Sequence, residues 1–174
     1  LTKVQAEADA TNQYPLPDLR TPVEISMNST NPGTILDVML GVRINHTWPA
    51  DLTMTLIHPD GTEVTLTDHN GNGSHRDGTE VWGEGSRSCN GDLAYFSQTA
   101  TQSIIDRSKP FTGFSRPVDN LNILEGKDAA GDWTLRIVDG WAQDDGELFC
   151  AQLLLATSNP DTTEIIDSQT SMND

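Results

Sequence analysis

The feature of this sequence that most constrains its fold is a period-two alternation of apolar residues over short segments. Between residues 36 and 44, every second position is apolar: Leu36, Val38, Leu40, Val42 and Ile44. Successive side chains of a β-strand point to opposite faces of a sheet, so this spacing places all five on one face. A helix would require a period of 3.6. We therefore predict a strand with one buried face.

The same alternation recurs along the chain. Residues 52–56 and 64–66 show it on either side of Pro59-Asp60-Gly61, a turn sequence, which predicts a β-hairpin over residues 52–67. Residues 133–137 and 149–155 alternate as well, whereas residues 101–107 indicate only a short helical turn. Short strands separated by turns are typical of sandwiches. The predicted fold is therefore all-β, an antiparallel sandwich or jelly roll.

The length of 174 residues fits one domain with polar ends. Residues 1–13 are polar and without periodicity, and we expect them to form a linker. Residues 14–157 form the predicted domain, and residues 158–174 an acidic, flexible tail. Within the domain, residues 68–92 are rich in Gly, Asp and Asn and predict a long loop.

The charge balance restricts the partners of the chain. Ten Lys and Arg residues stand against 26 Asp and Glu residues, which gives a net charge of −16. Phosphate backbones and anionic lipid surfaces repel such a chain, so we expect neither nucleic acid nor membrane as a partner. We expect the isolated domain to be a monomer.

Two cysteines, Cys89 and Cys150, are present without CxxC spacing, which argues against structural zinc and thioredoxin-type redox chemistry. In a secreted chain they would form a disulfide, and in a cytosolic chain they would remain buried thiols. The disulfide is the preferred interpretation, together with an extracellular location.

Three segments carry a family resemblance. The first is residues 44–52 (INHTWPADL), which are followed by a predicted strand and by residues 59–62 (PDGT). The second is residues 131–135 (GDWTL), which are followed by Val138-Asp139 and by residues 145–148 (DGEL). The third is residues 14–18 (YPLPD). In this order the segments resemble the P domain (P/Homo B domain) of kexin- and furin-like subtilisin-family serine proteases, in its bacterial form. The residues that carry the resemblance, expected to be structural, are His46, Thr47, Asp51, Trp133, Asp139 and Gly146.

The resemblance implies an all-β fold, an antiparallel jelly-roll β-sandwich of about eight strands. It also implies a non-catalytic accessory domain of a secreted subtilisin-like serine endopeptidase, which packs in cis on the catalytic domain and stabilises it. An alternative is an accessory module that binds the substrate of an extracellular protease, either a protein fibre or a carbohydrate. In this alternative the parent enzyme could also be a metalloprotease. The candidate aromatic residues for contact with the catalytic domain or with a substrate are Trp48, Trp82 and Trp141. The other interpretation of each is that it packs in the core.

The sequence departs from the family at three positions. Trp48 and Ala50 stand where Tyr and Gly are usual, and Ala151 replaces a usual Trp in the last strand. We expect Trp141 or Phe149 to fill the core there.

The most family-specific polar residues are His46 and Asp51. A His at a strand end and an Asp after the following turn would hydrogen-bond loop backbone and fix the corner of a sandwich. Contact with a partner domain is the functional alternative.

Calcium is the only cofactor that the residue pattern suggests. Residues 68–73 (DHNGNG) match the first half of a calcium loop, although no Glu stands at its twelfth position. A first candidate site comprises Asp68, Asn70, Asn72 and Asp77, and a second comprises Asp139, Asp144 and Asp145.

Catalytic motifs are absent from the sequence. It contains no Gly-x-Ser-x-Gly, no Gly-Thr-Ser of the subtilisin nucleophile type and no His-Glu-x-x-His. We therefore expect no catalytic residue within this chain.

Overall fold

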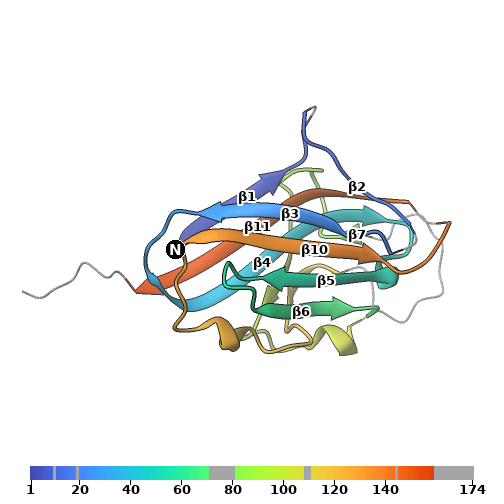
Figure 1. Cartoon of the computed structure of the whole chain (residues 1–174). Coiled ribbons are helices and arrows are strands. Elements are labelled where there is room, and N and C mark those ends of the chain that lie inside the picture. Colours follow the sequence, from blue (N-terminus) through green and yellow to red (C-terminus); the bar gives the residue numbers. More distant parts are fainter. Residues whose placement is uncertain (10, 19, 71–80, 108–110, 144, 159–174) are drawn as a thin grey trace, which may run out of the picture.

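The computed structural model describes residues 1–9, 11–18, 20–70, 81–107, 111–143 and 145–158, which form two β-sheets packed face to face (Figure 1). The larger sheet has the order β1 (Thr2–Glu7), β11 (Gly146–Ser158), β4 (Thr34–His46), β8 (Ala94–Ser97) and β9 (Gly113–Ser115), with β2 (Tyr14–Leu16) paired to β11 and β7 (Val81–Trp82) to β4. The smaller sheet has the order β3 (Val23–Ser29), β10 (Gly131–Asp139), β5 (Leu52–Ile57) and β6 (Glu63–Asp68). Three 3₁₀ turns complete the description: η1 (Pro49–Asp51), η2 (Ile104–Asp106) and η3 (Leu121–Leu124).

The predicted all-β sandwich is confirmed. The long strand pairings are antiparallel, and β8 with β9 is parallel. From β3 to β5 and again from β9 to β11, the chain crosses between the two sheets. Eleven strands are described instead of about eight, because short strands such as β2, β7 and β9 add to the longer ones. The predicted helical turn is η2, where the Ser103 Oγ accepts a hydrogen bond from the Ile105 N–H.

The core lies between the two sheets and contains the alternating residues that the sequence singled out. Nine of them are at most 1 % exposed: Leu40, Val42, Ile44, Leu52, Met54, Leu56, Trp133, Leu135 and Ile137. Each fully buried large apolar side chain contributes roughly 1.5–3 kcal/mol relative to an exposed one. The period-two patterns therefore identified the inner faces of β4, β5 and β10 correctly.

Leu36 is an exception, and the prediction that it shares the inner face of β4 is wrong. Its side chain is 57 % exposed, whereas Ile35 is buried. The pairing of β4 with β11 shifts register between Asp37–Ala156 and Ile35–Thr157, which marks a β-bulge. A shift of one residue turns every side chain beyond it to the opposite face.

The first residues of the chain differ from the predicted linker. Thr2–Glu7 form β1, which pairs antiparallel with β11 from Thr2–Leu155 to Glu7–Cys150. A strand is held in a sheet mainly by backbone hydrogen bonds, which any sequence of residues other than proline can form. Because β1 is polar, its composition gave no indication that it is a strand. At the other end β11 reaches Ser158, and the predicted tail beyond it lies outside the described residues.

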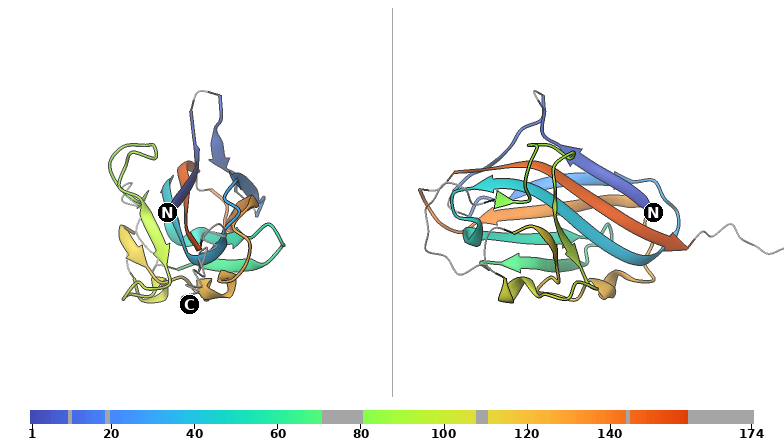
Figure 2. Two further views of the ribbon diagram at one scale, coloured as in Figure 1. Left: turned by 90° about the vertical axis from the view of Figure 1, so that its left-hand side faces the viewer. Right: turned by 180° about the vertical axis from the view of Figure 1, so that it is seen from behind.

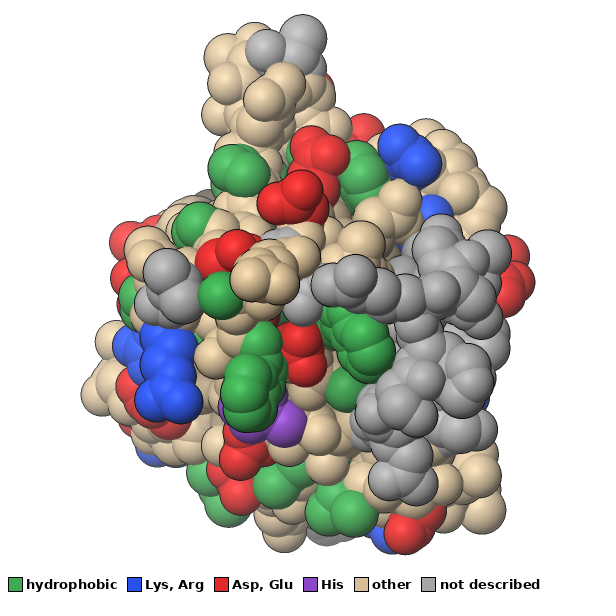
Figure 3. Space-filling model, turned by 90° about the vertical axis from the view of Figure 1, so that its right-hand side faces the viewer, with side chains coloured by type: hydrophobic (Ala, Val, Ile, Leu, Met, Phe, Trp, Pro, Cys, Tyr) green, Lys and Arg blue, Asp and Glu red, His purple; other side chains and the backbone are tan. Residues whose placement is uncertain are grey.

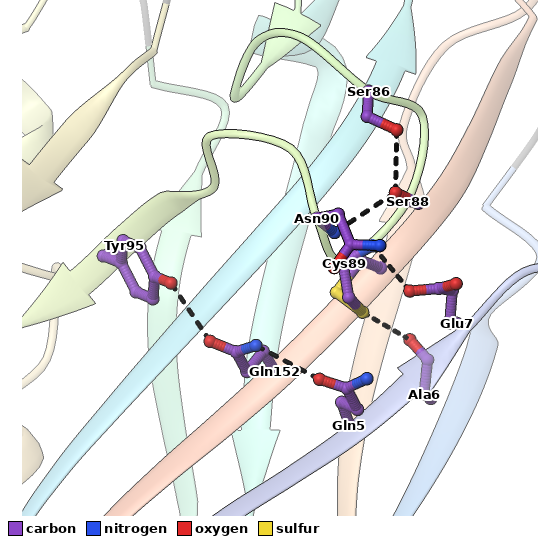
Figure 4. The surroundings of a disulfide bond; sticks show 10 residues. Gln5, Ala6, Glu7, Ser86, Ser88, Cys89, Asn90, Tyr95 and Gln152 are labelled. Atoms are coloured by element: carbon purple, nitrogen blue, oxygen red, sulfur yellow. Dashed lines mark hydrogen bonds between the residues drawn. A yellow bond between two sulfur atoms is a disulfide. The ribbon is translucent and has the colours of Figure 1, made fainter.

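The predicted disulfide is confirmed. Cys89 and Cys150 are bonded, with a Cα–Cα distance of 5.1 Å, and the bond ties residues 83–93 to the central strand β11 (Figure 4). The Glu7 carboxylate accepts a hydrogen bond of 2.7 Å from the Cys89 N–H. This segment is therefore fixed to both β1 and β11. Within the described part of the chain, no helix is long and apolar enough to cross a membrane.

Candidate interaction face at the end of the sandwich

Several strands meet at one end of the sandwich, on the right in Figure 1: β4 and β10 end there, and β5 and β11 begin there. This end brings together five of the six residues of the family resemblance: His46, Thr47, Asp51, Asp139 and Gly146. We call the described residues 46–51, 139–143 and 145–146 the His46 corner. Trp133, the sixth residue, lies in the core, where its indole N–H donates to the Ala129 carbonyl at 3.1 Å.

A buried hydrogen bond between His46 and Asp139 lies at the centre of the His46 corner. His46 Nε2 is 2.8 Å from Asp139 Oδ2, and both side chains have an exposed fraction of 0 %. His46 Nδ1 accepts a hydrogen bond of 3.0 Å from the Trp48 N–H. Because Nδ1 is an acceptor, Nε2 carries the ring proton and donates it to the carboxylate. The two ring nitrogens therefore connect the end of β4 to the end of β10.

Asp139 extends this network to the neighbouring segments. Its Oδ1 accepts a hydrogen bond of 3.1 Å from the Trp141 N–H, and its backbone carbonyl accepts one of 2.8 Å from the Arg20 N–H. A buried carboxylate needs such donors, because burial without partners is costly. Asp139 thus holds the backbone that presents Trp141.

Gly146 fits the His46 corner because it has no side chain. A Cβ at this position would overlap the His46 ring and would lie 3.2 Å from the Asn45 carbonyl oxygen. Asn45 and His46 pair with Glu147 and Gly146 in the sheet. The glycine therefore allows the imidazole to lie directly over the first residue of β11.

Our interpretation was that His46 and Asp51 hydrogen-bond loop backbone, and the structure adds a partner for His46 that the sequence did not suggest, the Asp139 carboxylate. The two residues are 93 positions apart, so no local pattern revealed the pair. Asp51 contributes to the corner through its backbone: its carbonyl accepts from the Gly140 N–H at 3.0 Å, and its N–H donates to the Trp48 carbonyl at 2.9 Å.

The three candidate tryptophans have different environments. Trp141 is 63 % exposed and Trp48 is partly buried. Trp82 is 1 % exposed and stacks on Phe111 with ring centroids 4.1 Å apart, so it has no face to offer a partner. Figure 3 looks onto this end, where hydrophobic side chains lie beside acidic and histidine side chains. Of the three, Trp141 is the exposed aromatic residue of the His46 corner.

The expectation that Trp141 or Phe149 fills the core beside Ala151 is wrong. Trp141 is exposed. Phe149 is 8 % exposed but lies apart from the main apolar cluster, with the guanidinium groups of Arg43 and Arg87 5.8 and 5.6 Å from its ring centroid. Cation–π contact, and not core filling, therefore explains the burial of Phe149. Burial lowers the pKa of Arg43, with a further contribution from the positive charge of Arg87.

The first calcium candidate is only partly described. Asn72 and Asp77 lie outside the described residues. Asp68 Oδ1 accepts from the Thr53 hydroxyl at 3.0 Å, and Asn70 Oδ1 accepts from the Asp68 N–H at 3.0 Å.

In the second candidate, Asp144 lies outside the described residues and the Asp139 carboxylate is engaged with His46. Among the residues that the structure describes, no cluster of three or more His, Cys, Asp or Glu side chains forms a metal site. Calcium binding stays a prediction, which calorimetric titration of metal-stripped protein would test.

The fold and the His46 corner define a β-sandwich domain whose distinctive polar residues support one end face. Residues 35–95 match the family model of the proprotein convertase P-domain. This segment, which runs from β4 to β8 and contains His46 and Asp51, belongs to that family, and the resemblance stated from the sequence is confirmed.

Two solved structures share the fold: the serine protease of Aeromonas sobria, and that protease in complex with the chaperone ORF2. Each is 16 % identical with a TM-score of 0.55, and the match covers 91 % of this chain and 27 % of that chain. At this identity the likeness shows the fold alone. The chain spans about a quarter of the length of these proteases. No curated protein matches the chain.

Proposed function

We propose that this chain is the non-catalytic P domain of a secreted subtilisin-like serine endopeptidase, and that it packs on the catalytic domain and stabilises it. The family match over residues 35–95 supports the domain type. The Aeromonas sobria serine protease contains the same fold within a longer chain, which supports a partner in cis. The disulfide supports an oxidising location outside the cytosol.

The observation that carries the proposed contact is the exposed Trp141 on a rigid support. Its N–H is held by Asp139, which is itself held by the buried His46. An exposed aromatic side chain on fixed backbone loses little conformational entropy when a partner covers it. Tryptophan is enriched among residues that dominate binding energies, where truncation costs about 2 kcal/mol or more. We propose that the His46 corner, with Trp141 at its centre, faces the catalytic domain.

The test uses the full-length protein encoded by the gene that carries this chain. Its catalytic domain should melt at a lower temperature when the P domain is deleted, because a partner that binds only the folded state stabilises it. Trp141→Ala in the full-length protein should reproduce part of that decrease, roughly 4 °C or more for about 2 kcal/mol. Phe114→Ala, an exposed aromatic residue at the edge of the larger sheet, is the matched control.

Three results would contradict the proposal. The first is a gene that encodes no subtilisin-type domain, or that encodes a metalloprotease domain instead. The second is a melting temperature of the catalytic domain that stays unchanged when the P domain is deleted. The third is that Trp141→Ala destabilises the isolated P domain as much as the full-length protein, because Trp141 would then be a residue of internal packing.

A further inference from the structure

A row of paired residues crosses the outer face of the larger sheet. The register partners run from Gln5 on β1 to Gln152 on β11, Gly41 on β4, Tyr95 on β8 and Phe114 on β9. In β11, β4 and β8, the residues on both sides of the row belong to the core. Because side chains alternate along a strand, the row points away from the core. Figure 2 (right) shows the larger sheet from this side.

The row is held together by hydrogen bonds between its own side chains. The Tyr95 hydroxyl donates to Gln152 Oε1 at 3.0 Å, and Gln152 Nε2 donates to Gln5 Oε1 at 3.2 Å (Figure 4). Burial raises the pKa of Tyr95, so its hydroxyl keeps its proton at neutral pH. A Cβ on Gly41 would lie 2.5 Å from Tyr95 Cε1. The glycine therefore lets the Tyr95 ring lie flat on the sheet.

Phe114 ends the row as an exposed aromatic platform. Its ring stacks on Tyr95 with centroids 5.2 Å apart and an interplanar angle of 18°, and the side chain is 56 % exposed. One ring face is thus covered by Tyr95, and the rest of the ring meets solvent. The Phe114 backbone is fixed as well, because Arg107 Nη1 donates to its carbonyl at 3.0 Å.

A surface hollow of about 420 Å³ adjoins this platform. It is lined by Met39, Ser97, Thr99, Ala100, Thr101, Gln102 and Phe114. Its volume falls within the range of roughly 300–1,000 Å³ that is usual for small-molecule sites. One wall is supported from behind, since Arg116 Nη1 donates to the carbonyls of Ala100 and Thr101 at 3.2 and 3.4 Å. These hydrogen bonds hold the backbone of Ala100 and Thr101 in that wall.

The chemistry of the lining selects the ligand class. None of the seven lining residues is charged, although the chain as a whole carries a net charge of −16. Four of the seven carry hydroxyl or amide groups, which both donate and accept hydrogen bonds: Ser97, Thr99, Thr101 and Gln102. An aromatic ring beside neutral donors and acceptors suits the apolar face and the hydroxyl groups of a sugar ring. A charged ligand would find no oppositely charged side chain among these residues.

We propose that this hollow binds a neutral saccharide unit, stacked on Phe114, and that the polar row beside it, through the buried Gln152, holds the Tyr95 ring on which Phe114 is stacked. The site lies on a different face from the His46 corner, so the inference goes beyond the proposed contact with a catalytic domain and does not depend on it.

The test is affinity electrophoresis of the full chain in gels that contain neutral β-glucan, xylan or galactomannan, followed by calorimetric titration with the matching hexasaccharide. At least one polysaccharide should retard the protein. Phe114→Ala should weaken hexasaccharide binding about tenfold, which corresponds to about 1.4 kcal/mol. Phe114→Leu, which keeps an apolar cover on Tyr95 but lacks the ring, should weaken binding as well. Trp141→Ala should leave it unchanged.

Melting temperatures of all variants establish that each is folded. Absence of retardation by every polysaccharide in the wild-type chain would overturn the proposal. Equal retardation of the wild type and the folded Phe114→Leu variant would also overturn it. Phe114-dependent binding of gelatin, an unfolded polypeptide, without binding of any polysaccharide would assign the hollow to peptide instead.

Discussion

Replacement of Asp139 by alanine removes the acceptor on which the His46 corner depends. In the wild type, Asp139 accepts from His46 Nε2 at 2.8 Å and from the Trp141 N–H at 3.1 Å. The imidazole N–H would lose its partner inside a site with no solvent exposure. A buried donor without a partner costs about 1–3 kcal/mol, and a hydrogen bond to a charged group such as the Asp139 carboxylate lies at the upper end of that range. We expect about 3 kcal/mol, or a decrease in melting temperature of roughly 6–12 °C.

Thermal unfolding of the isolated domain, followed by circular dichroism at neutral pH, measures this loss. Asp139→Asn keeps the shape and an acceptor oxygen, so it should fall between the wild type and Asp139→Ala. Asp132→Ala is the matched control, because Asp132 lies on the same strand and its exposed carboxylate bonds only across the surface to Asn28 at 2.6 Å. It should change the stability by about 0.5 kcal/mol or less. Equal melting temperatures for Asp139→Ala and Asp132→Ala would refute the importance of the buried pair.

Three further predictions concern other supports of the fold. Gly146→Ala should lower the melting temperature by several degrees or prevent folding, because the added methyl group overlaps the His46 ring; an unchanged melting temperature would contradict this packing. Replacement of both cysteines by serine should cost about 4 kcal/mol for the 61-residue separation, measured by urea unfolding, and a loss below about 1 kcal/mol would contradict it. The hydrogen bond from Lys127 lowers the pKa of Asp60, so this contact stabilises the fold fully above the ordinary carboxyl pKa of 3.8 and loses its effect gradually as the pH falls from there through the lowered pKa of the folded state. Lys127→Met should therefore lower the melting temperature most near neutral pH and by progressively less as the pH falls below 3.8, and an effect that does not depend on pH would contradict this.

The sequence was sufficient for the sandwich because its core strands alternate strictly, as in residues 52–56 and 133–137. The prediction from sequence was wrong where the alternation of apolar residues does not match the burial or the strand pairing in the structure. The bulge that exposes Leu36 depends on the pairing of β4 with β11, which no local pattern contains. Strand β1 escaped notice because an edge strand needs backbone partners more than apolar side chains.

The candidate sites show the same limit. His46 and Asp139 were both recognised as characteristic residues, but their contact joins positions 93 residues apart. Trp82 and Trp141 both stood in loop-like sequence, and only the fold separates the buried ring from the exposed one. No sequence pattern indicated that Tyr95 and Phe114 stack on each other, because this contact arises from the parallel register of β8 and β9. An aromatic residue in alternation with core residues, such as Tyr95 between Ala94 and Phe96, was the one available hint.

The two proposed contacts use separate supports, which makes them separable by experiment. Trp141 follows β10 of the smaller sheet and is held by Asp139. Phe114 lies on β9 of the larger sheet and is held by Tyr95 and Arg107. Because the two aromatic residues share none of these partners, the effects of their replacement should add. The double variant should lose both the stabilisation of the catalytic domain and the binding of saccharide, each by the amount of the single variant. A loss of saccharide binding on Trp141→Ala alone would show instead that one surface serves both contacts.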